Sequence, residues 1–362
     1  MLLINLIGYH EGNMTGYGVA TRYFWKAMEK LSWDGCKFLL TDLRHPAQVE
    51  SNIFSCRQFT GKIINIWLQV GPGVETLARF PGEKIAYTMF ETDTLPMGWV
   101  EGLNQADRVF TPSTWGRQIM IDCGVDFSKI QVIPLGVDGS IYNPWGGKLA
   151  QLNTPTFKFL MVGRYESRKG YNELFSAFAK AFSQRMDVEL LVKANSFIDS
   201  VSTQQIRALA HQFGLTNVRF IEGAVDEPTM AALYRSCDCF VFPSKGEGWG
   251  LPLIEAMACG LPVISTYCSG HSEYLSKFRG RFQEIDAAYK EVDTKDFDRF
   301  YRFESDPGKW YIPFPDSIAS AMQKLVEKKM IINTEELAMD VIKYYSWEQA
   351  AHTMMWYLKN AY

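Results

Sequence analysis

Two glutamates, Glu247 and Glu255, are the residues of this sequence whose type and position best suit binding chemistry. They lie in a glycine-rich stretch, residues 243–266, which reads PSKGEGWGLPLIEAMACGLPVIST. A carboxylate can accept hydrogen bonds from a pair of hydroxyl groups such as a sugar presents. A glycine-rich loop lets backbone N–H groups come close to an anion. The stretch therefore predicts a site for a sugar beside a phosphate; the alternative is two acids that offset a helix dipole.

The same stretch predicts the elements that would hold these glutamates. An apolar run typical of a buried strand precedes it at residues 239–242, and a second such run lies near its end at 262–265. A helical segment, residues 251–259, lies between the two runs. Pro252 suits the first turn of the helix because its missing N–H would have no partner there. Gly260 suits the end of the helix. Glu247 is thus placed in the loop, and Glu255 just over one turn into the helix.

Arg164 and Lys169 place positive charge in a second loop. The loop reads GRYESRKG and follows a predicted strand at residues 157–162, before a helix that begins at Tyr171. An arginine presents a planar fork of donors, and a lysine presents a compact point charge. Together they suit the oxygens of a diphosphate group.

These two phrases resemble the signatures of a known enzyme family. The E-x7-E spacing within EGWGLPLIEAMACGLPVIS and the phrase G-R-x(4)-K-G are similar to those of retaining family-four glycosyltransferases (glycosyl transferases group 1), which have the GT-B fold. In that family the first glutamate and the loop amides after it hold the donor sugar, the second glutamate holds the ribose, and the two cations hold the phosphates. The resemblance assigns these roles to Glu247, Gly248, Trp249, Gly250, Leu251, Glu255, Arg164 and Lys169.

Another loop, at residues 222–225, resembles the place where enzymes of the family contact the nucleotide base. The resemblance implies that Glu222, Gly223 and Val225 lie beside the base. These residues do not distinguish a uracil donor from a guanine donor.

Gly16 and Gly18 form a glycine pair before the first predicted helix, at residues 17–31. A dinucleotide-binding fingerprint is disfavoured, because Thr21 stands where a third glycine belongs and the preceding loop is too long for the tight turn. The family carries a glycine loop here that faces the donor phosphates and the acceptor, so the resemblance implies this role. A plain helix start is the alternative.

The segment FETDTLP contains two acids, Glu91 and Asp93, where many members of the family have a histidine that faces the donor sugar. The segment resembles a subtype of the family. Glu91 could bind an acceptor hydroxyl or take its proton. Alternatively, both acids cap the helix predicted at residues 97–106.

Alternating strands and helices predict an α/β protein of two doubly wound, Rossmann-like domains. The other strands are expected at residues 2–8, 63–70, 84–89, 108–111, 130–135, 188–194 and 218–223, and a linker at 138–155. The GT-B resemblance implies that the domains, residues 1–140 and 141–345, face each other across a cleft, and that a terminal helix, 346–362, crosses back to the first domain. Residues 279–315 show no clear period.

Composition sets the remaining bounds. The chain has 362 residues and a net charge of −3, so no overall field attracts nucleic acid. Seven cysteines form no C-x-x-C pair and five histidines are scattered, which predicts no zinc site and a reduced, cytoplasmic protein, peripheral to a membrane at most. The N-terminal MLLINLIG lacks a basic start and is expected to be a strand rather than a signal. His271 is expected to cap a helix or lie on the surface.

The resemblance implies transfer of a sugar from a nucleotide-diphosphate donor, such as a UDP- or GDP-sugar, to a hydroxyl acceptor, with retention and no cofactor. No D-x-D pair lies near the end of a predicted strand, so metal independence is expected. A front-face mechanism is proposed for the family, and a covalent enzyme intermediate is the contested alternative. The acceptor could be a polysaccharide, a lipid-linked saccharide, a protein or a nucleic-acid base. A non-catalytic sugar-binding module and a GT-B epimerase are the rival interpretations.

Overall fold

The computed structural model divides the chain into two compact units, each of which is described by itself. It describes residues 1–10, 15–31, 33–194, 200–292, 307–328 and 334–360. The first unit comprises Met1–Gly136 and the chain from Tyr345 onward, and the second comprises most of the chain between Val137 and Tyr344. The division falls four residues before the boundary expected after residue 140.

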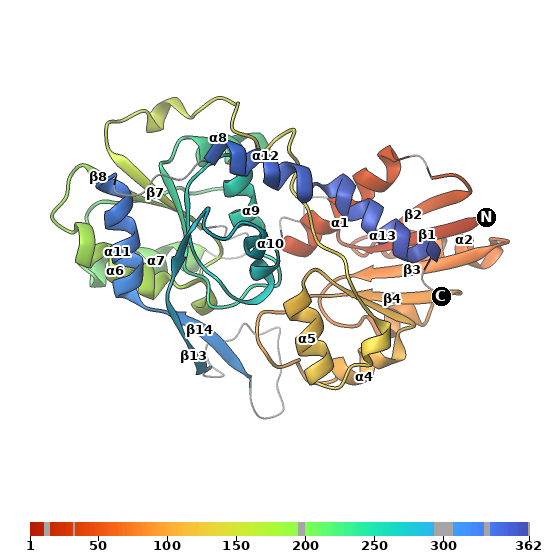
Figure 1. Ribbon diagram of the computed structural model, residues 1–362. Helices are drawn as coiled ribbons and strands as arrows, with labels where there is room; N and C mark the ends of the chain where they lie inside the picture. The colour runs from red at the N-terminus through yellow and green to blue at the C-terminus, as the bar shows by residue number, and fades with distance from the viewer. Residues whose placement is uncertain (11–14, 32, 195–199, 293–306, 329–333, 361–362) are drawn as a thin grey trace. The chain divides into compact units, whose positions relative to one another are not determined.

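The first unit contains a six-stranded parallel sheet with strand order β2-β1-β3-β4-β5-β6 (Figure 1). The strands are β1 (Leu2–Gly8), β2 (Cys36–Asp42), β3 (Lys62–Leu68), β4 (Glu83–Tyr87), β5 (Arg108–Thr111) and β6 (Ile130–Val132). The helices are α1 (Gly16–Lys30), α2 (Pro46–Gln58), α3 (Val74–Leu77), α4 (Trp99–Gln105), α5 (Thr114–Asp122) and α13 (Trp347–Asn360). The sequence did not assign β2 or α2, which lie in the stretch left without elements.

The second unit contains another six-stranded parallel sheet, with strand order β12-β11-β10-β7-β8-β9. Its strands are β7 (Phe157–Val162), β8 (Val188–Lys193), β9 (Val218–Phe220), β10 (Cys239–Phe242), β11 (Val263–Thr266) and β12 (Gln283–Ile285). The helices are α6 (Tyr171–Phe182), α7 (Ser200–Gln212), α8 (Glu227–Arg235), α9 (Leu251–Ala258), α10 (Ser272–Lys277), α11 (Pro315–Val326) and α12 (Thr334–Tyr344). The predicted helix between the two strands of the central stretch is therefore α9.

Residues 279–315, to which the sequence assigned no element, contain three strands in the described part. β12 extends the second sheet, whereas β13 (Ala287–Glu291) and β14 (Lys309–Pro313) form a separate antiparallel pair. Tyr289 and Tyr311 lie opposite each other in this pair, with ring centroids 4.8 Å apart. This cross-strand aromatic contact stabilises the pair, although the sequence of these strands shows no clear period.

Burial explains why both sheets form where they do. In the second unit, Phe159, Phe178 and Phe182 pack their rings together between β7 and α6 and are almost fully buried. In the first unit, Trp347 at the start of α13 stacks on Tyr23 of α1 with centroids 5.1 Å apart. The terminal helix therefore packs on α1, and the structure counts it with the first unit.

Each sheet has one point where the strand order reverses direction. In the first unit it lies between β1 and β3, and in the second between β7 and β10. In doubly wound sheets, ligands bind outside the carboxyl ends of the strands at such a point. The loops that follow these four strands are therefore the first places to look for a site.

Candidate active site

A buried ion cluster lies at the strand-order reversal of the second unit, in the loops after β7 and β10. The Glu247 carboxylate accepts hydrogen bonds from Lys169 Nζ, at 2.6 Å, and from Ser244 Oγ, also at 2.6 Å. Arg168 Nη1 lies 3.0 Å from the other carboxylate oxygen. Burial alone would raise the pKa of Glu247, but Lys169 and Arg168 lower it to about 2. Glu247 is therefore a fixed anion within a positively charged pair of loops.

Arg168 is a member of this cluster that the sequence did not single out. Its guanidinium also lies 2.7 Å from Glu166 and donates to the Gly246 carbonyl at 3.2 Å. It thus ties the loop after β7 to the glycine loop after β10. The residue stands within the unspecified part of the G-R-x(4)-K-G phrase, so the only available signal was one more cation in the same loop.

Arg164, in contrast, does not join Glu247 in the described structure. Its guanidinium pairs with Glu166 at 2.7 Å, and its side chain is 46% exposed. The structure therefore separates the two predicted phosphate ligands into a buried lysine and a half-exposed arginine that share one loop. A half-exposed guanidinium held by one carboxylate is available to an incoming anion, because surface ion pairs contribute little.

The loop after β11 holds the backbone of Glu247 from both sides. Glu247 N donates to Ser269 Oγ at 2.9 Å, and Gly270 N donates to the Glu247 carbonyl at 2.8 Å. Ser269 has a φ of 45°, a left-handed conformation that is uncommon for serine. A Cβ on Gly270 would overlap the Gly248 carbonyl group. The position of the glycine loop thus depends on a close backbone contact.

The remaining residues of the glycine loop lead into α9. Trp249 is 2% exposed, and its ring packs against Tyr274 with centroids 5.1 Å apart. Gly250, with a φ of 88°, precedes Leu251 at the first position of the helix. The predicted sugar contacts thus lie on one continuous segment, although the Trp249 side chain faces the protein interior.

Glu255 lies on α9 with a partner different from those of Glu247. It accepts a hydrogen bond from the Tyr234 hydroxyl at 3.0 Å. Burial raises the pKa of Glu255 to about 8. The two glutamates of the E-x7-E spacing therefore have opposite protonation tendencies at neutral pH. The different surroundings of the two carboxyl groups cause this difference in pKa.

His271 lies at the N-cap position of α10, one of the two places predicted for it, and not on the surface. It is fully buried, makes no cap hydrogen bond at α10, and its Nε2 lies 2.9 Å from the Thr266 carbonyl. That contact makes Nε2 the protonated nitrogen, since a carbonyl can only accept. Burial lowers the pKa of His271 to about 4. The residue is a neutral link between β11 and the loop that clamps Glu247.

This burial gives a pH prediction. The folded pKa of His271, about 4, lies below the ordinary value of 6.5, so the unfolded chain binds its proton more readily. We expect the free energy of unfolding to fall by on the order of 3 kcal/mol from this residue as pH drops from about 6.5 to about 4. The variant His271→Gln should lack that part of the pH dependence in urea unfolding. Equal slopes in the two proteins would contradict the assignment.

The loop predicted to face a nucleotide base follows β9. Gly223 has a φ of 78°, and its carbonyl accepts a hydrogen bond from Lys193 Nζ at 2.5 Å. Glu222 is exposed and pairs with Arg207 at 2.6 Å. Val225 is partly exposed. Lys193, the last residue of β8, thus fixes the backbone of this loop from a strand the sequence did assign.

In the first unit, Tyr17 joins the two predicted groups, the Gly16–Gly18 loop and the segment of Glu91. Its hydroxyl donates to the Met89 carbonyl at 2.7 Å and accepts from Met89 N at 2.9 Å. Burial raises the pKa of Tyr17, and the nearby negative charge of Glu91 raises it further. The sequence analysis did not identify Tyr17, which lies between the two glycines it did identify.

The loop also forms an ordinary helix start, the alternative to a ligand-binding role. Thr15 Oγ1 accepts a hydrogen bond from Gly18 N at 3.2 Å, which satisfies one amide of the first turn of α1. A Cβ on Gly16 would meet nothing within 4 Å. The loop therefore has both features: open space beside Gly16, as a ligand-facing loop needs, and the hydrogen-bonded cap of an ordinary helix start. Glu91 and Asp93 precede α4, whose cap position is Gly98 rather than either acid.

Within the described ranges, no group of three or more His, Cys, Asp or Glu residues is arranged to hold a metal ion. Among the helices of the same ranges, none is both long enough and apolar enough to cross a membrane.

Comparisons with known proteins agree with the resemblance. Residues 149–284 match the sequence model of the family described as glycosyl transferases group 1. The D-inositol 3-phosphate glycosyltransferase of Arthrobacter sp. (strain FB24) is 34% identical over 175 residues, 47% of this chain and 41% of that protein. The chain thus matches less than half the length of this relative. The D-inositol 3-phosphate glycosyltransferase of Segniliparus rotundus is 33% identical over 150 residues, 40% of this chain and 33% of that protein.

Solved structures match over almost the whole chain at low identity. Sucrose-phosphate synthase from Thermosynechococcus elongatus aligns with a TM-score of 0.70 at 19% identity, covering 99% of this chain and 98% of that one. A glycosyltransferase from Rickettsia africae ESF-5 aligns with a TM-score of 0.72 at 14% identity and covers 99% of both chains. The fold is GT-B, as predicted. Residues 149–284 are similar to the group 1 glycosyltransferases.

Proposed function

We propose that this protein is a retaining glycosyltransferase that moves a sugar from a nucleotide-diphosphate donor to a hydroxyl acceptor. The observation that carries the proposal is the buried cluster of Lys169, Arg168 and Glu247 at the strand-order reversal of a sheet within the matched family segment. A diphosphate leaving group needs its developing charge offset by fixed donors, and preorganised donors in a dry site are the strongest kind. Lys169 of the cluster would be one such donor, and Arg164 of the same loop would be another.

The donor would bind across the loops of the second unit. Arg164 and Lys169 would hold the diphosphate, together with the amides from Gly248 to Leu251 and the start of α9. Glu247, kept ionised by its cations, would accept hydrogen bonds from sugar hydroxyls. Glu255 would contact the ribose, and the loop of Glu222, Gly223 and Val225 would lie beside the base. A related fold, Anabaena Alr3699/HepE, was crystallised with UDP-glucose, which favours a UDP-sugar as the first donor to test.

The chemistry follows from what the cluster can do. As the bond between the anomeric carbon and the phosphate oxygen breaks, negative charge grows on the diphosphate and is stabilised by the cations. In the front-face mechanism, the leaving phosphate takes the proton of the acceptor hydroxyl, which attacks from the same side and gives retention. Glu91 of the first unit is proposed to bind that acceptor, and Gly16 and Gly18 to line the donor side.

The direct test is incubation with UDP-glucose or GDP-mannose, followed by mass spectrometry of the donor products and of added saccharide, lipid-linked and protein acceptors. Release of the nucleoside diphosphate is the expected result, with a mass increase of one hexose on an acceptor. Binding of donor without release or transfer would indicate a sugar-binding module. Recovery of an isomerised donor sugar would indicate an epimerase.

We expect this transfer not to require a divalent cation. The charges of Lys169 and Arg164, with the loop amides, are proposed to offset the diphosphate in place of a metal. The same assay in excess EDTA should retain most of the activity seen in magnesium. Activity lost in EDTA and restored by magnesium or manganese would show that the leaving group is held differently.

A further inference from the structure

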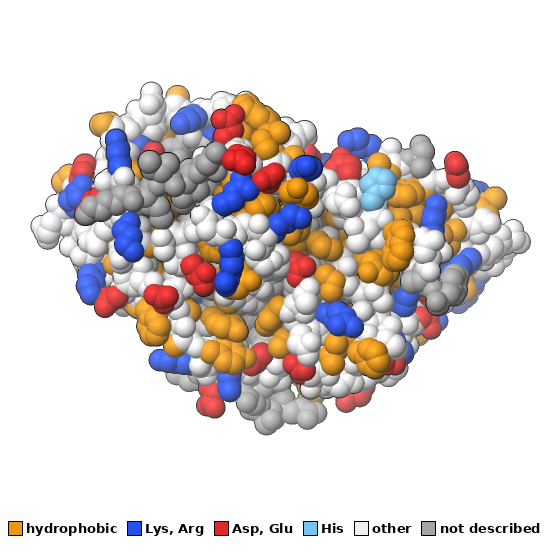
Figure 2. All heavy atoms as spheres, in the orientation of Figure 1, with side chains coloured by type: hydrophobic (Ala, Val, Ile, Leu, Met, Phe, Trp, Pro, Cys, Tyr) orange, Lys and Arg blue, Asp and Glu red, His pale blue; other side chains and the backbone are white. Residues whose placement is uncertain are grey.

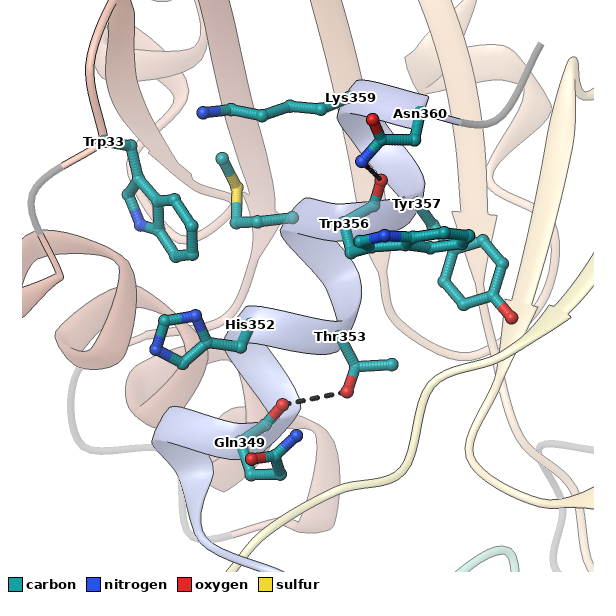
Figure 3. A pocket seen from close by; sticks show the side chains of 9 residues that line it. Trp33, Gln349, His352, Thr353, Trp356, Tyr357, Lys359 and Asn360 are labelled. Atoms are coloured by element: carbon teal, nitrogen blue, oxygen red, sulfur yellow. Dashed lines mark hydrogen bonds between the residues drawn. The ribbon is translucent and has the colours of Figure 1, made fainter.

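Helix α13 carries a pocket of about 600 Å³ whose lining includes none of the candidate site residues described above. Trp33, from the segment between α1 and β2, lies on one side of the helix with His352 and Lys359, and Trp356 and Tyr357 lie on the other (Figure 3). Figure 2 shows a histidine beside hydrophobic side chains over this helix. The volume falls in the range of ordinary small-ligand sites.

The pocket lies at the opposite edge of the first sheet from the candidate site residues of that unit. Arg108, the first residue of β5, donates from Nη1 to the Tyr357 carbonyl at 2.7 Å, so this part of α13 lies where the strands begin. Gly18 and Glu91 follow the carboxyl ends of β1 and β4. A strand of seven residues separates these edges by roughly 20 Å. The pocket is therefore a separate site.

The aromatic groups of the pocket are braced rather than loose. The Trp33 and His352 rings meet edge to face with centroids 5.0 Å apart, and Lys359 Nζ lies 5.3 Å from the Trp33 centroid. Trp356 and Tyr357 meet at 4.9 Å and 89°. Trp356 is nevertheless 58% exposed. A braced indole with an accessible face suits stacking, because little conformational entropy remains to be lost on binding.

The helix that presents these groups is itself fixed. The Trp347–Tyr23 stack anchors the start of α13, and the exposed pair of Lys30 and Glu348, 2.8 Å apart, lies beside it. The inward residues Met355 and Leu358 are almost fully buried. Trp356 is thus exposed on a helix whose opposite face is firmly packed.

The polar groups of the lining select the class of ligand. Among the described residues that line the pocket, Gln349 and Asn360 contribute amides, Thr353 a hydroxyl and Lys359 an ammonium group, and none contributes a carboxylate. Thr353 Oγ1 donates to the Gln349 carbonyl at 2.9 Å and Asn360 Nδ2 to the Trp356 carbonyl at 3.0 Å, and both side chains retain acceptor oxygens. A ligand with one apolar face and many hydroxyls matches this set, and a cation does not.

We propose that this pocket binds a saccharide chain, neutral or acidic, with a pyranose ring stacked on Trp356 and its hydroxyls held by the neighbouring amides. The aromatic face covers the C–H face of the ring, and neutral donors and acceptors satisfy the hydroxyls. Lys359 adds affinity for an acidic sugar. The site stands independently of the proposed transfer reaction, because it requires neither donor nor catalysis.

Isothermal titration of the full chain with maltohexaose, chitohexaose and hexagalacturonate tests this. We expect at least one probe to bind, and Trp356→Ala to weaken that binding about tenfold or more, as loss of a central aromatic anchor does. Lys359→Met should weaken only hexagalacturonate. Trp145→Ala is the matched control, because this tryptophan of the second unit is 62% exposed and outside the pocket. Thermal unfolding of each variant should stay close to wild type.

Three results would overturn the proposal. The first is that none of the probes binds at up to about 10 mM, well above a millimolar Kd. The second is that a probe binds equally well to Trp356→Ala and to wild type. The third is that Trp356→Ala instead abolishes sedimentation with phosphatidylcholine–phosphatidylglycerol vesicles while saccharides bind to neither protein, which would make the pocket a lipid-contact surface.

Discussion

Replacing Lys169 with methionine is expected to lower kcat/KM for sugar transfer by about 10²–10³-fold, the usual effect of losing one preorganised donor. Lys169 is 7% exposed, and its ammonium lies 2.6 Å from Glu247. The substitution keeps most of the buried volume but removes the charge proposed to offset the leaving diphosphate. Activity should be measured as release of nucleoside diphosphate.

Lys180→Met is the matched control, because Lys180 forms an exposed pair with Asp316 in the same unit. It should leave kcat/KM unchanged. A folded Lys169→Met variant with less than about a threefold loss would remove Lys169 from the mechanism.

Glu247→Gln tests the other half of the pair. It keeps the shape and one acceptor oxygen but leaves Lys169 and Arg168 without their anion, and turnover should fall at least about tenfold. Because the two residues are in direct contact, the double variant should lose less than the sum of the single losses. Additive losses would indicate that they act on separate parts of the reaction.

Gly270→Ala is expected to reduce both stability and turnover, since the new methyl group would overlap the Gly248 carbonyl and lie 2.7 Å from the Glu247 carbonyl oxygen. Both are backbone atoms, so the glycine loop must move. Overpacking of this kind costs about 1–3 kcal/mol, and displacement of the loop would misplace Glu247. We expect a lower melting temperature and at least about a tenfold lower turnover.

Gly147→Ala provides the comparison, because a Cβ there meets nothing within 4 Å. It should behave as wild type in both measurements. Ser269→Ala should give an intermediate result, since it removes one hydrogen bond to Glu247 N, about 0.5–1.5 kcal/mol. Wild-type turnover in Gly270→Ala would mean that the clamp does not position the loop.

Much of the fold could be predicted from local patterns. The apolar runs of β1, β7 and β10 lie where expected, because buried parallel strands are continuously hydrophobic. The glycine at 250 and the proline at 252 placed the start of α9. The strand β2 and the helix α2 were missed, since the burial pattern of β2 is only partial and α2 has little amphipathic contrast. Pairing with β1, whose partner residues lie 34 positions earlier in the chain, establishes β2.

The candidate site was predicted as a set of residues, and the structure determined their partners. Composition and spacing gave the glycine loop, its two glutamates and the cations of the loop after β7, because these signals are contiguous in sequence. The approach of Lys169 to Glu247 joins positions 78 residues apart. Arg168, Ser269 and Tyr17 act through contacts between loops that only the packing of strands and helices creates.

The sequence by itself determined which elements form and where charge and glycine are concentrated, because hydrophobic periodicity and backbone preference are local properties. Tertiary structure decided the chemical state of each group. Glu247 is held ionised by the buried Lys169 and the partly buried Arg168, whereas Glu255, eight residues later, has its pKa raised by burial. Desolvation and neighbouring charge depend on what surrounds a side chain in three dimensions, and neither is written in its spacing along the chain.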